Sequence, residues 1–324
     1  MKKKILFIVN PISGTANKKQ ILATLEKNLN KDLYEWEVAY TEYAGHARLL
    51  ASDAVKKGID IVTAIGGDGT VNEVGSSLVN TDTALGIIPC GSGNGLARHL
   101  GIPVNAKRAA DVFNNGVIVD MDYGLINGKP FFCTCGVGFD ANVSYKFAQT
   151  GKRGFIKYMQ LTVKEGLKYK SEHYTVEDDK GNVYEDTFYL VTCGNASQYG
   201  NNFFVTPHAV MNDGLLDVTI LKPFPLVDSP QVIYQMFNRK IGNNKRSTLI
   251  RTTKLHIHRD EPGVMHYDGD PVIGPADIDI EVVRHGIKMV VFKDKPTVPE
   301  SNSAVKSTKP IQITQDQLQK LKNK

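Results

Sequence analysis

The apolar positions of the first 100 residues alternate between two spacings. Continuous apolar runs, typical of buried strands, occur at 4–10, 59–65 and 84–89, and an alternating run occurs at 36–41. Apolar residues at helical spacing occur at 17–28, 46–57 and 71–79, and a further helix begins at 95–100. In the helix at 46–57 we expect Ala47, Leu49, Leu50 and Ala54 to face inward. This order predicts a parallel sheet with helices on both faces.

After about residue 117 the pattern changes to short strands separated by turn residues such as Asn127-Gly128 and Lys180-Gly181. The expected strands are 117–122, 131–137, 174–177, 187–192, 216–221, 253–258, 263–267, 276–283 and 289–292. One helix, Phe155–Tyr169, interrupts them. We expect it to pack on the strands and to expose a basic face, a membrane-touching face being the alternative.

The change of pattern divides the chain into three parts. We predict an α/β domain over 1–122, a mainly antiparallel β-sandwich domain over 123–295, and a linker with a C-terminal tail over 296–324. Residues 296–309 are polar and typical of a linker, and a short polar helix is expected at 315–322.

The most informative segment is Gly66-Gly67-Asp68-Gly69-Thr70, which joins a buried strand to a helix. Backbone N–H groups and the helix dipole at such a turn suit a phosphate, and glycines allow its close approach. Asp68 would repel a bare phosphate, so we expect a magnesium ion between them. The segment is neither a Walker A loop nor the dinucleotide fingerprint. A tight turn without ligand is the plain alternative.

Two other loops follow strands in the same way, at 10–14 and 89–95, and Thr41 and His46 follow a fourth strand. The carboxyl ends of parallel strands meet at one sheet edge, so these loops should face one crevice. In the second part, Asp213-Gly214 and Asp268-Gly269-Asp270 read as ordinary turns from their spacing alone. Phosphoryl transfer to a hydroxyl also needs a carboxylate to accept the proton, and these are the candidates.

Composition narrows the class of protein. The chain has 324 residues, 41% hydrophobic and 23% charged, with a net charge of +5, which permits but does not require contact with anionic membranes or nucleotides. We expect no transmembrane segment, no signal peptide and no nucleic-acid partner. Cys133 and Cys135 are expected on one face of a core strand rather than in a zinc site, and the four cysteines suit a reducing cytoplasm.

These motifs together resemble the diacylglycerol kinase catalytic domain family, which includes bacterial lipid kinases, sphingosine kinases and ceramide kinases. The segment 66–74 carries the resemblance. Supporting matches lie at 10–14, 41–47, 86–94, 97–103, 138–141 and 213–215. The resemblance implies a nucleotide-binding α/β domain of the NAD kinase/diacylglycerol kinase type, followed by a β-sandwich, with ATP in the cleft between them.

The resemblance also implies site residues. ATP would be bound by Asn10, Thr41, Gly66, Gly67, Asp68, Gly69, Thr70, Val71, Asn72 and Ser92. Asp68 would help to place the catalytic Mg²⁺. A second, structural Mg²⁺ would be held by the Asp213 carboxylate and the backbone carbonyls of Val210 and Leu215. Asp270, one methylene shorter than the family's usual Glu, would be the proton acceptor.

The expected function is therefore transfer of the γ-phosphate of Mg-ATP to a lipid hydroxyl at a membrane surface, by a cytoplasmic protein in peripheral contact with the membrane. Diacylglycerol or a related glycerolipid is the first candidate acceptor. A sphingoid base is the second, because Asn94 is followed by Gly95 as in sphingosine kinases. An NAD kinase and a non-catalytic nucleotide- or lipid-binding module are further alternatives. The oligomeric state stays open, a homodimer included.

Overall fold

The computed structural model describes residues 1–14, 16–151, 154–166 and 168–293. Its first half contains β1 (Lys3–Val9), α1 (Lys18–Asn28), β2 (Tyr34–Tyr40), α2 (His46–Lys56), β3 (Ile61–Gly66), α3 (Asp68–Leu78), β4 (Ala84–Pro89), α4 (Gly95–His99), α5 (Ala106–Asn115), β5 (Gly116–Ile126), β6 (Lys129–Phe131), β7 (Thr134–Gly138) and α6 (Phe139–Gln149). The second half contains α7 (Phe155–Gly166), β8 (Glu172–Asp178), β9 (Val183–Phe188), β10 (Leu190–Gly194), β11 (Leu216–Leu221), α8 (Ser229–Phe237), β12 (Ser247–Thr252), β13 (Lys254–His258), β14 (Gly263–Tyr267), β15 (Asp270–Gly274) and β16 (Asp277–Phe292), with short 3₁₀ turns at Leu226–Asp228 and Ile241–Asn243.

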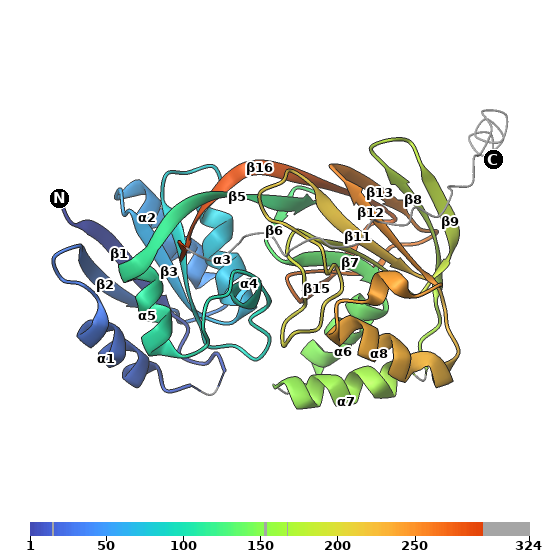
Figure 1. Cartoon of the computed structure of the whole chain (residues 1–324), viewed down its shortest axis with the longest axis horizontal. Helices are drawn as coiled ribbons and strands as arrows, with labels where there is room; N and C mark the ends of the chain where they lie inside the picture. The colour runs from blue at the N-terminus through green and yellow to red at the C-terminus, as the bar shows by residue number, and fades with distance from the viewer. Residues whose placement is uncertain (15, 152–153, 167, 294–324) are drawn as a thin grey trace.

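The N-terminal domain is a parallel sheet in the order β2-β1-β3-β4 (Figure 1). Strands β3 and β4 are buried along their whole length, which explains their continuous apolar sequences. Helix α1 packs beside α5, and α2 packs beside α3. The strand order reverses between β1 and β3, so the loops that follow these two strands border the crevice where ligands of such sheets bind.

Two long strands connect the halves of the molecule. β16 pairs with β5 in antiparallel fashion along most of its length, and it also pairs with β4 of the first domain and β13 of the second (Figure 1). The register shifts between Val283 and Ile287, where His285 has a φ of 50°. The buried Asp122 carboxylate holds this bend, because it accepts hydrogen bonds from the backbone N–H groups of His285 at 2.8 Å and Gly214 at 2.7 Å.

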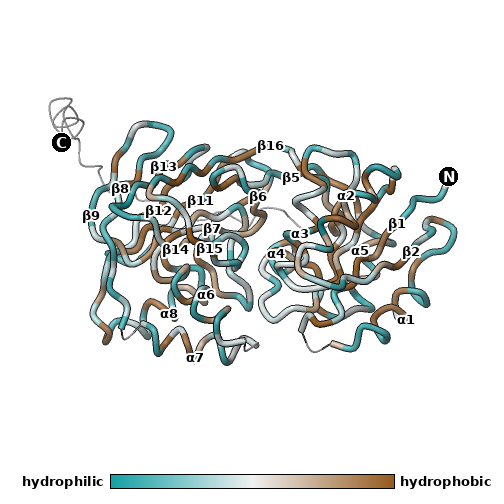
Figure 2. The backbone as a smooth tube through the Cα atoms, turned by 180° about the vertical axis from the view of Figure 1, so that it is seen from behind, coloured by the Kyte–Doolittle hydropathy of each residue, from teal (hydrophilic) through white to brown (hydrophobic). Residues whose placement is uncertain are grey.

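The second domain is a sandwich of two sheet layers. One layer continues the first sheet through β13, β8 and β9, and the other is a separate sheet in the order β12-β11-β10-β7-β14-β15. Residues such as Val191, Val218 and Ile257 fill the space between the layers. Helices α6, α7 and α8 lie together below the second sheet in Figure 1. Figure 2 shows apolar positions along the strands and polar positions at many turns.

The predicted α/β domain followed by a mainly antiparallel β-sandwich is confirmed. Three details are wrong. Leu49 is 55% exposed, because Ala47, Ala51 and Ala54 form the buried face of α2. The second domain contains α6 and α8 besides α7, and the strands expected at 276–283 and 289–292 form one bent strand, β16.

Other differences are local. Helix α5 and strands β9, β12 and β15 were not expected as separate elements. Cys133 and Cys135 are both buried, but they belong to the cores of different domains. The predicted linker at 296–309 and helix at 315–322 lie outside the described residues. The domain division at 122 stays a prediction, and the C-terminal end of β16 packs into the core of the first domain.

None of the helices in the described part of the chain combines the length and apolar character that crossing a bilayer requires.

Candidate active site

The three glycine-rich loops contact one another through their backbones. A Cβ added at Gly14 would lie 1.7 Å from the carbonyl oxygen of Cys90, and one added at Gly91 would lie 2.6 Å from the Cα of Gly67. Only glycine permits this approach, so the loops after β1, β3 and β4 form one continuous wall. The Asn10 side chain donates to the Thr70 hydroxyl at 3.0 Å and so joins the first loop to α3. The predicted meeting of these loops at one sheet edge is what the structure shows.

Two features of this wall suit an anion. The N-terminus of α3 begins directly after Gly67, and the Lys18 ammonium donates to the backbone carbonyls of Ser13 and Ala16. A helix N-terminus and a nearby ammonium both favour a phosphate. Lys18 was not a predicted site residue, since a lysine early in a helix carries no distinct sequence signal.

Asp68 joins two of the loops. Its carboxylate accepts hydrogen bonds from the backbone N–H groups of Asn94 and Gly95, both at 2.8 Å. Burial raises the pKa of Asp68 to about 6, the nearby Asp268 carboxylate adds to the rise, and the two N–H donors oppose it. A buried acid in this state gains from a cation beside it.

Asp268 is a structural residue that fixes the second domain to the first. Its carboxylate accepts from the backbone N–H groups of Phe132 at 2.9 Å and Cys133 at 2.7 Å, and from the Asn72 side chain at 2.8 Å. Asn72 also donates to the Pro130 carbonyl at 3.1 Å. These bonds tie α3 to the start of β7, so the side chain of Asn72 is engaged away from the loop wall.

Asp270 lies just across the tight turn of the β14–β15 hairpin. The turn residues, Asp268 with a φ of 48° and Gly269 with a φ of 84°, are both left-handed, as a two-residue type I′ hairpin requires. The turn brings the Asp270 carboxylate over Gly69 at the N-terminus of α3, where an added Cβ would lie 3.5 Å from Oδ2. Desolvation in the cleft, together with the charges of Asp268 and Glu73, raises the pKa of Asp270 to about 6, although His266 opposes the rise.

One cavity of about 620 Å³ connects these groups to an apolar pocket in the second domain. At one end it is lined by Asn10, Gly67, Asp68, Gly69, Thr70 and Ser92. At the other end it is lined by apolar side chains of α6, α7 and α8, such as Phe147, Met159 and Met236. Asp270 borders the same cavity. A polar, glycine-lined end and an apolar end therefore share one space.

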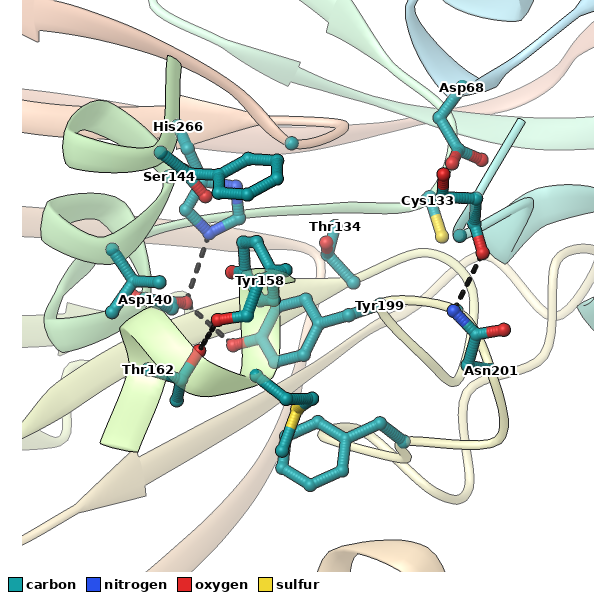
Figure 3. A pocket seen from close by; sticks show the side chains of 18 of the residues that line it. Asp68, Cys133, Thr134, Asp140, Ser144, Tyr158, Thr162, Tyr199, Asn201 and His266 are labelled. Carbon is teal, nitrogen blue, oxygen red and sulfur yellow. Dashed lines mark hydrogen bonds and ion pairs between the residues drawn. The ribbon is translucent and has the colours of Figure 1, made fainter. Parts of the chain in front are cut away.

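A second polar cluster lies in the wall of this cavity (Figure 3). The Asp140 carboxylate accepts hydrogen bonds from the hydroxyls of Thr192 and Tyr199, each at 2.6 Å, and lies 3.0 Å from His266 Nε2. Burial alone would raise the pKa of Asp140, but His266 and the two hydroxyls outweigh it, and the pKa is lowered. None of these residues was predicted as a site residue, because they come from four separate segments of the chain.

The remaining residues predicted to bind ATP lie outside the lining of the cavity. Thr41 is buried at the end of β2, and its N–H donates to the Val9 carbonyl at 2.9 Å. Gly66 packs against Thr70, and the Val71 side chain lies in the hydrophobic core. These residues and Asn72 support the loop wall rather than line the cavity, and their contact with a nucleotide stays a prediction.

The loop predicted to hold a structural Mg²⁺ has a different cation beside it. The Asp213 carboxylate forms an ion pair with the Arg251 guanidinium, whose Nε lies 3.3 Å from Asp217. A metal ion bound by Asp213, Val210 and Leu215 would have to compete with this guanidinium, so the residues present fit that ion poorly. Within the described part of the chain, no group of three or more His, Cys, Asp or Glu side chains is arranged to hold a metal ion.

Comparison with known proteins agrees with this geometry. Residues 4–126 match the diacylglycerol kinase catalytic domain, and residues 133–291 match the YegS C-terminal NAD kinase beta sandwich-like domain. The chain is 31% identical over 302 residues to a diacylglycerol kinase of Mycobacterium tuberculosis, with 87% of this chain and 96% of that protein covered. It is 28% identical over 299 residues to a diacylglycerol kinase of Bacillus subtilis, covering 90% and 98%.

A solved structure titled as a putative diacylglycerol kinase from Bacillus anthracis superposes with a TM-score of 0.72 at 26% identity, covering 92% of this chain and 99% of that one. The domain matches, the relatives and the superposition each span nearly the whole fold, including the loop wall and the β14–β15 hairpin. The chain belongs to the diacylglycerol kinase family.

Proposed function

We propose that this protein is an ATP-dependent lipid kinase, which transfers the γ-phosphate of Mg-ATP to the hydroxyl of diacylglycerol or a related glycerolipid. One observation carries the proposal: a single cavity runs from the glycine-loop wall, past the Asp270 carboxylate, into a pocket lined by apolar side chains. A phosphate donor and an apolar acceptor can therefore meet at one acid. Family membership supports the same reaction class.

In the proposed reaction the backbone N–H groups of the loop wall and the N-terminus of α3 hold the phosphates of ATP. Asp270 accepts the proton of the lipid hydroxyl. The lipid oxygen forms a bond to the γ-phosphorus, the bond from that phosphorus to the bridging oxygen breaks, and ADP leaves. The pKa of Asp270 is raised to about 6, so its carboxylate is a stronger base than that of an ordinary aspartate.

Asp68 is the residue that would hold Mg²⁺, directly or through water. Two N–H donors engage its carboxylate, but each oxygen keeps a further acceptor position, and burial beside Asp268 gives the site an excess of negative charge. A magnesium ion would supply positive charge that offsets the charge on the transferring phosphoryl group. We do not extend this proposal to the second ion at Asp213, because Arg251 already provides a cation there.

The pocket favours a neutral acceptor over a long-chain amine. An ammonium group buried in such a pocket needs a free carboxylate. Asp140 is engaged by His266, Thr192 and Tyr199. Asp68 is assigned to Mg²⁺ and Asp270 to the transferred proton, and Asp268 accepts three backbone N–H groups. The geometry therefore favours glycerolipids over sphingoid bases.

We infer that the mouth of the cavity lies beside Leu226 and α7, where the surface suits contact with a membrane. Leu226 is 55% exposed, Val227 is 82% exposed and Val163 of α7 is 57% exposed, and Leu226 and Val163 also line the cavity. Lys157 and Lys164, in the same helix as Val163, are also exposed. Apolar residues flanked by cations bind anionic bilayers. We propose that the lipid enters here, from the cytoplasmic face of the membrane.

The direct test is transfer of label from Mg-ATP to a panel of micellar acceptors. The panel contains diacylglycerol, monoacylglycerol, sphingosine, dihydrosphingosine and ceramide, with soluble NAD as a non-lipid acceptor. We expect label on a glycerolipid. Label on a sphingoid base would replace the acceptor, label on NAD would overturn the lipid assignment, and bound ATP without any labelled product would indicate a non-catalytic module.

A further inference from the structure

His266 has one ring nitrogen with a partner and one without. The residue is 1% exposed and lines the wall of the cavity, with Nε2 3.0 Å from Asp140 Oδ2. Its Nδ1 atom is buried and has no hydrogen-bond partner within the described part of the chain. Buried polar atoms without partners are rare in folded proteins, so this nitrogen needs an explanation.

The surroundings of Asp140 indicate which ring nitrogen of His266 donates to it. Asp140 accepts from the hydroxyls of Thr192 and Tyr199 and from the backbone N–H of Ala141 at 2.8 Å. Three donors on one acid hold it in the ionised form. An ionised carboxylate only accepts hydrogen bonds, so His266 Nε2 donates to it, and Nδ1 is the ring nitrogen left for a ligand.

His266 lies in the same hairpin as Asp270, the proposed base. His266 is opposite Pro271 in the β14–β15 register, and the next pair is Tyr267 with Asp270. His266 and the proposed base therefore belong to one hairpin and line one cavity. His266 lines the cavity, and its Nδ1 atom is buried in the cavity wall. Figure 3 shows His266 and Asp140 joined at one end of the pocket, away from Asp68.

We propose that His266 Nδ1–H donates a hydrogen bond to an ester carbonyl of the acceptor lipid, next to the hydroxyl that Asp270 deprotonates. The inference rests on the proposed function, since it assumes a glycerolipid acceptor. Asp140 is the positioning residue: with Thr192 and Tyr199 it holds the imidazolium in place. The protein then distinguishes acyl esters from ether lipids, which have no carbonyl oxygen, because an ether leaves the buried donor unpaired.

The experiment compares kcat/KM for dioctanoylglycerol with kcat/KM for the matching dioctyl ether. We expect the wild type to prefer the ester by about tenfold or more, the discrimination that one unpaired buried polar group produces. In His266→Gln the amide N–H can keep the bond to Asp140 and the amide oxygen faces the lipid, so the preference should fall to about one. The control is His256→Gln, at a partly exposed histidine whose Nδ1 lies 2.8 Å from Asp279, and this variant should keep the wild-type ratio.

The ester-to-ether ratio is measured within each variant, so a smaller folded fraction does not change it. Equal use of both lipids by the wild type, or an unchanged ratio in His266→Gln, overturns the role of His266 while leaving the kinase assignment intact. His266→Gln protein that binds ATP but phosphorylates neither lipid also overturns it as a selectivity device. A wild type that phosphorylates only sphingoid bases, or no lipid, overturns the proposed acceptor and this inference together.

Discussion

At the scale of single residues, the Asp270 carboxylate has the position and the charge state that a proton acceptor needs. The hairpin turn places it over the N-terminus of α3, and desolvation with two neighbouring acids raises its pKa to about 6. The family more often has Glu at this place, as the resemblance implied. Aspartate is one methylene shorter than glutamate, so it can act as the base only if the hairpin turn brings its carboxylate close to the lipid hydroxyl. Substitution of Asp270 tests this idea.

Asp270→Asn should lower kcat by about 10²-fold or more, because the amide cannot accept the hydroxyl proton. Asp270→Glu restores a carboxylate and should keep kcat within about tenfold of the wild type. ATP should still bind to both variants, since the glycine loops and the N-terminus of α3 that hold the phosphates are unchanged. Steady-state kinetics with a glycerolipid and calorimetry with ATP measure these effects, with the surface variant Asp53→Asn as the control. A fully active Asp270→Asn enzyme would move the base elsewhere.

The raised pKa of Asp270 also predicts opposite effects of pH on rate and stability. kcat/KM should rise as the pH increases through about 6, because the carboxyls of Asp270 and Asp68 ionise there. The two acids titrate together, so the apparent pKa of the rate profile belongs to the pair. A carboxyl whose pKa is higher in the folded state stabilises the fold at low pH. That stability is lost as pH rises from 3.8, its ordinary pKa, to about 6.

Asp270→Asn removes this titration. Its Tm should therefore equal that of the wild type near pH 4 and exceed it at pH 7.5. Thermal melting at both pH values measures the difference. A variant that is less stable than the wild type at pH 7.5 contradicts the assigned direction of the pKa shift.

At the scale of elements, the nucleotide site depends on how closely the loops after β3 and β4 approach. Gly91→Ala would place a Cβ 2.6 Å from the Gly67 Cα and 2.9 Å from Asn94 Oδ1. The loops must separate, so we expect a loss of about 1–3 kcal/mol in the free energy of unfolding and at least tenfold weaker ATP binding.

Gly58→Ala is the matched control, because Gly58 has a φ of 67° and open space around it. Its left-handed backbone makes alanine unfavourable by about 1 kcal/mol, but ATP binding should not change. Urea unfolding and ATP titration compare the two variants. Equal ATP affinity in both would show that the loop contact does not shape the phosphate site.

The ion pairs of Arg251 beside the loop before β11 give a second prediction at this scale. Arg251 pairs with Asp213 and Asp217, so we expect the Tm of the nucleotide-free wild type to be the same in Mg²⁺ and in EDTA. Arg251→Met removes the cation, and its lower Tm should be partly restored by Mg²⁺ bound at Asp213. Arg246→Met, at an exposed position, is the control. A wild-type Tm that rises with Mg²⁺ would support the metal site predicted at Val210, Asp213 and Leu215.

At the scale of the whole molecule, the two domains are joined by long strands, and the proposed mouth of the cavity lies beside α7 and the turn at Leu226–Asp228. Val227→Ser should lower the rate with lipid in anionic vesicles several-fold, because Val227 is 82% exposed and would enter the bilayer surface. The rate with a dispersed short-chain lipid should not change. Leu49→Ser, on the outer face of α2, is the control. Equal loss with both forms of lipid would argue against membrane contact at this mouth.

Many elements and part of the site were predictable because they depend on local pattern. The buried strands, the glycine turn at Gly66–Thr70 and the Asp268-Gly269 turn each result from residues close together in the sequence. Helix α6 was missed because its apolar residues show only a weak helical spacing, whereas α8 was missed although its buried Val232, Gln235 and Met236 follow that spacing. Leu49 was assigned inward by the same spacing, but small alanines gave α2 a closer fit to the sheet.

The sequence by itself determined the fold class, the family and the loop wall, since strand period, glycine and turn chemistry act within a few residues. Only the tertiary structure decided which distant groups meet. It brought His266, Asp140, Thr192 and Tyr199 into one cluster, paired Arg251 with Asp213, and turned Asn72 from the loop wall to Asp268. These contacts join segments far apart in the chain, and the packing of helices on sheets, not the local residue pattern, sets their distances.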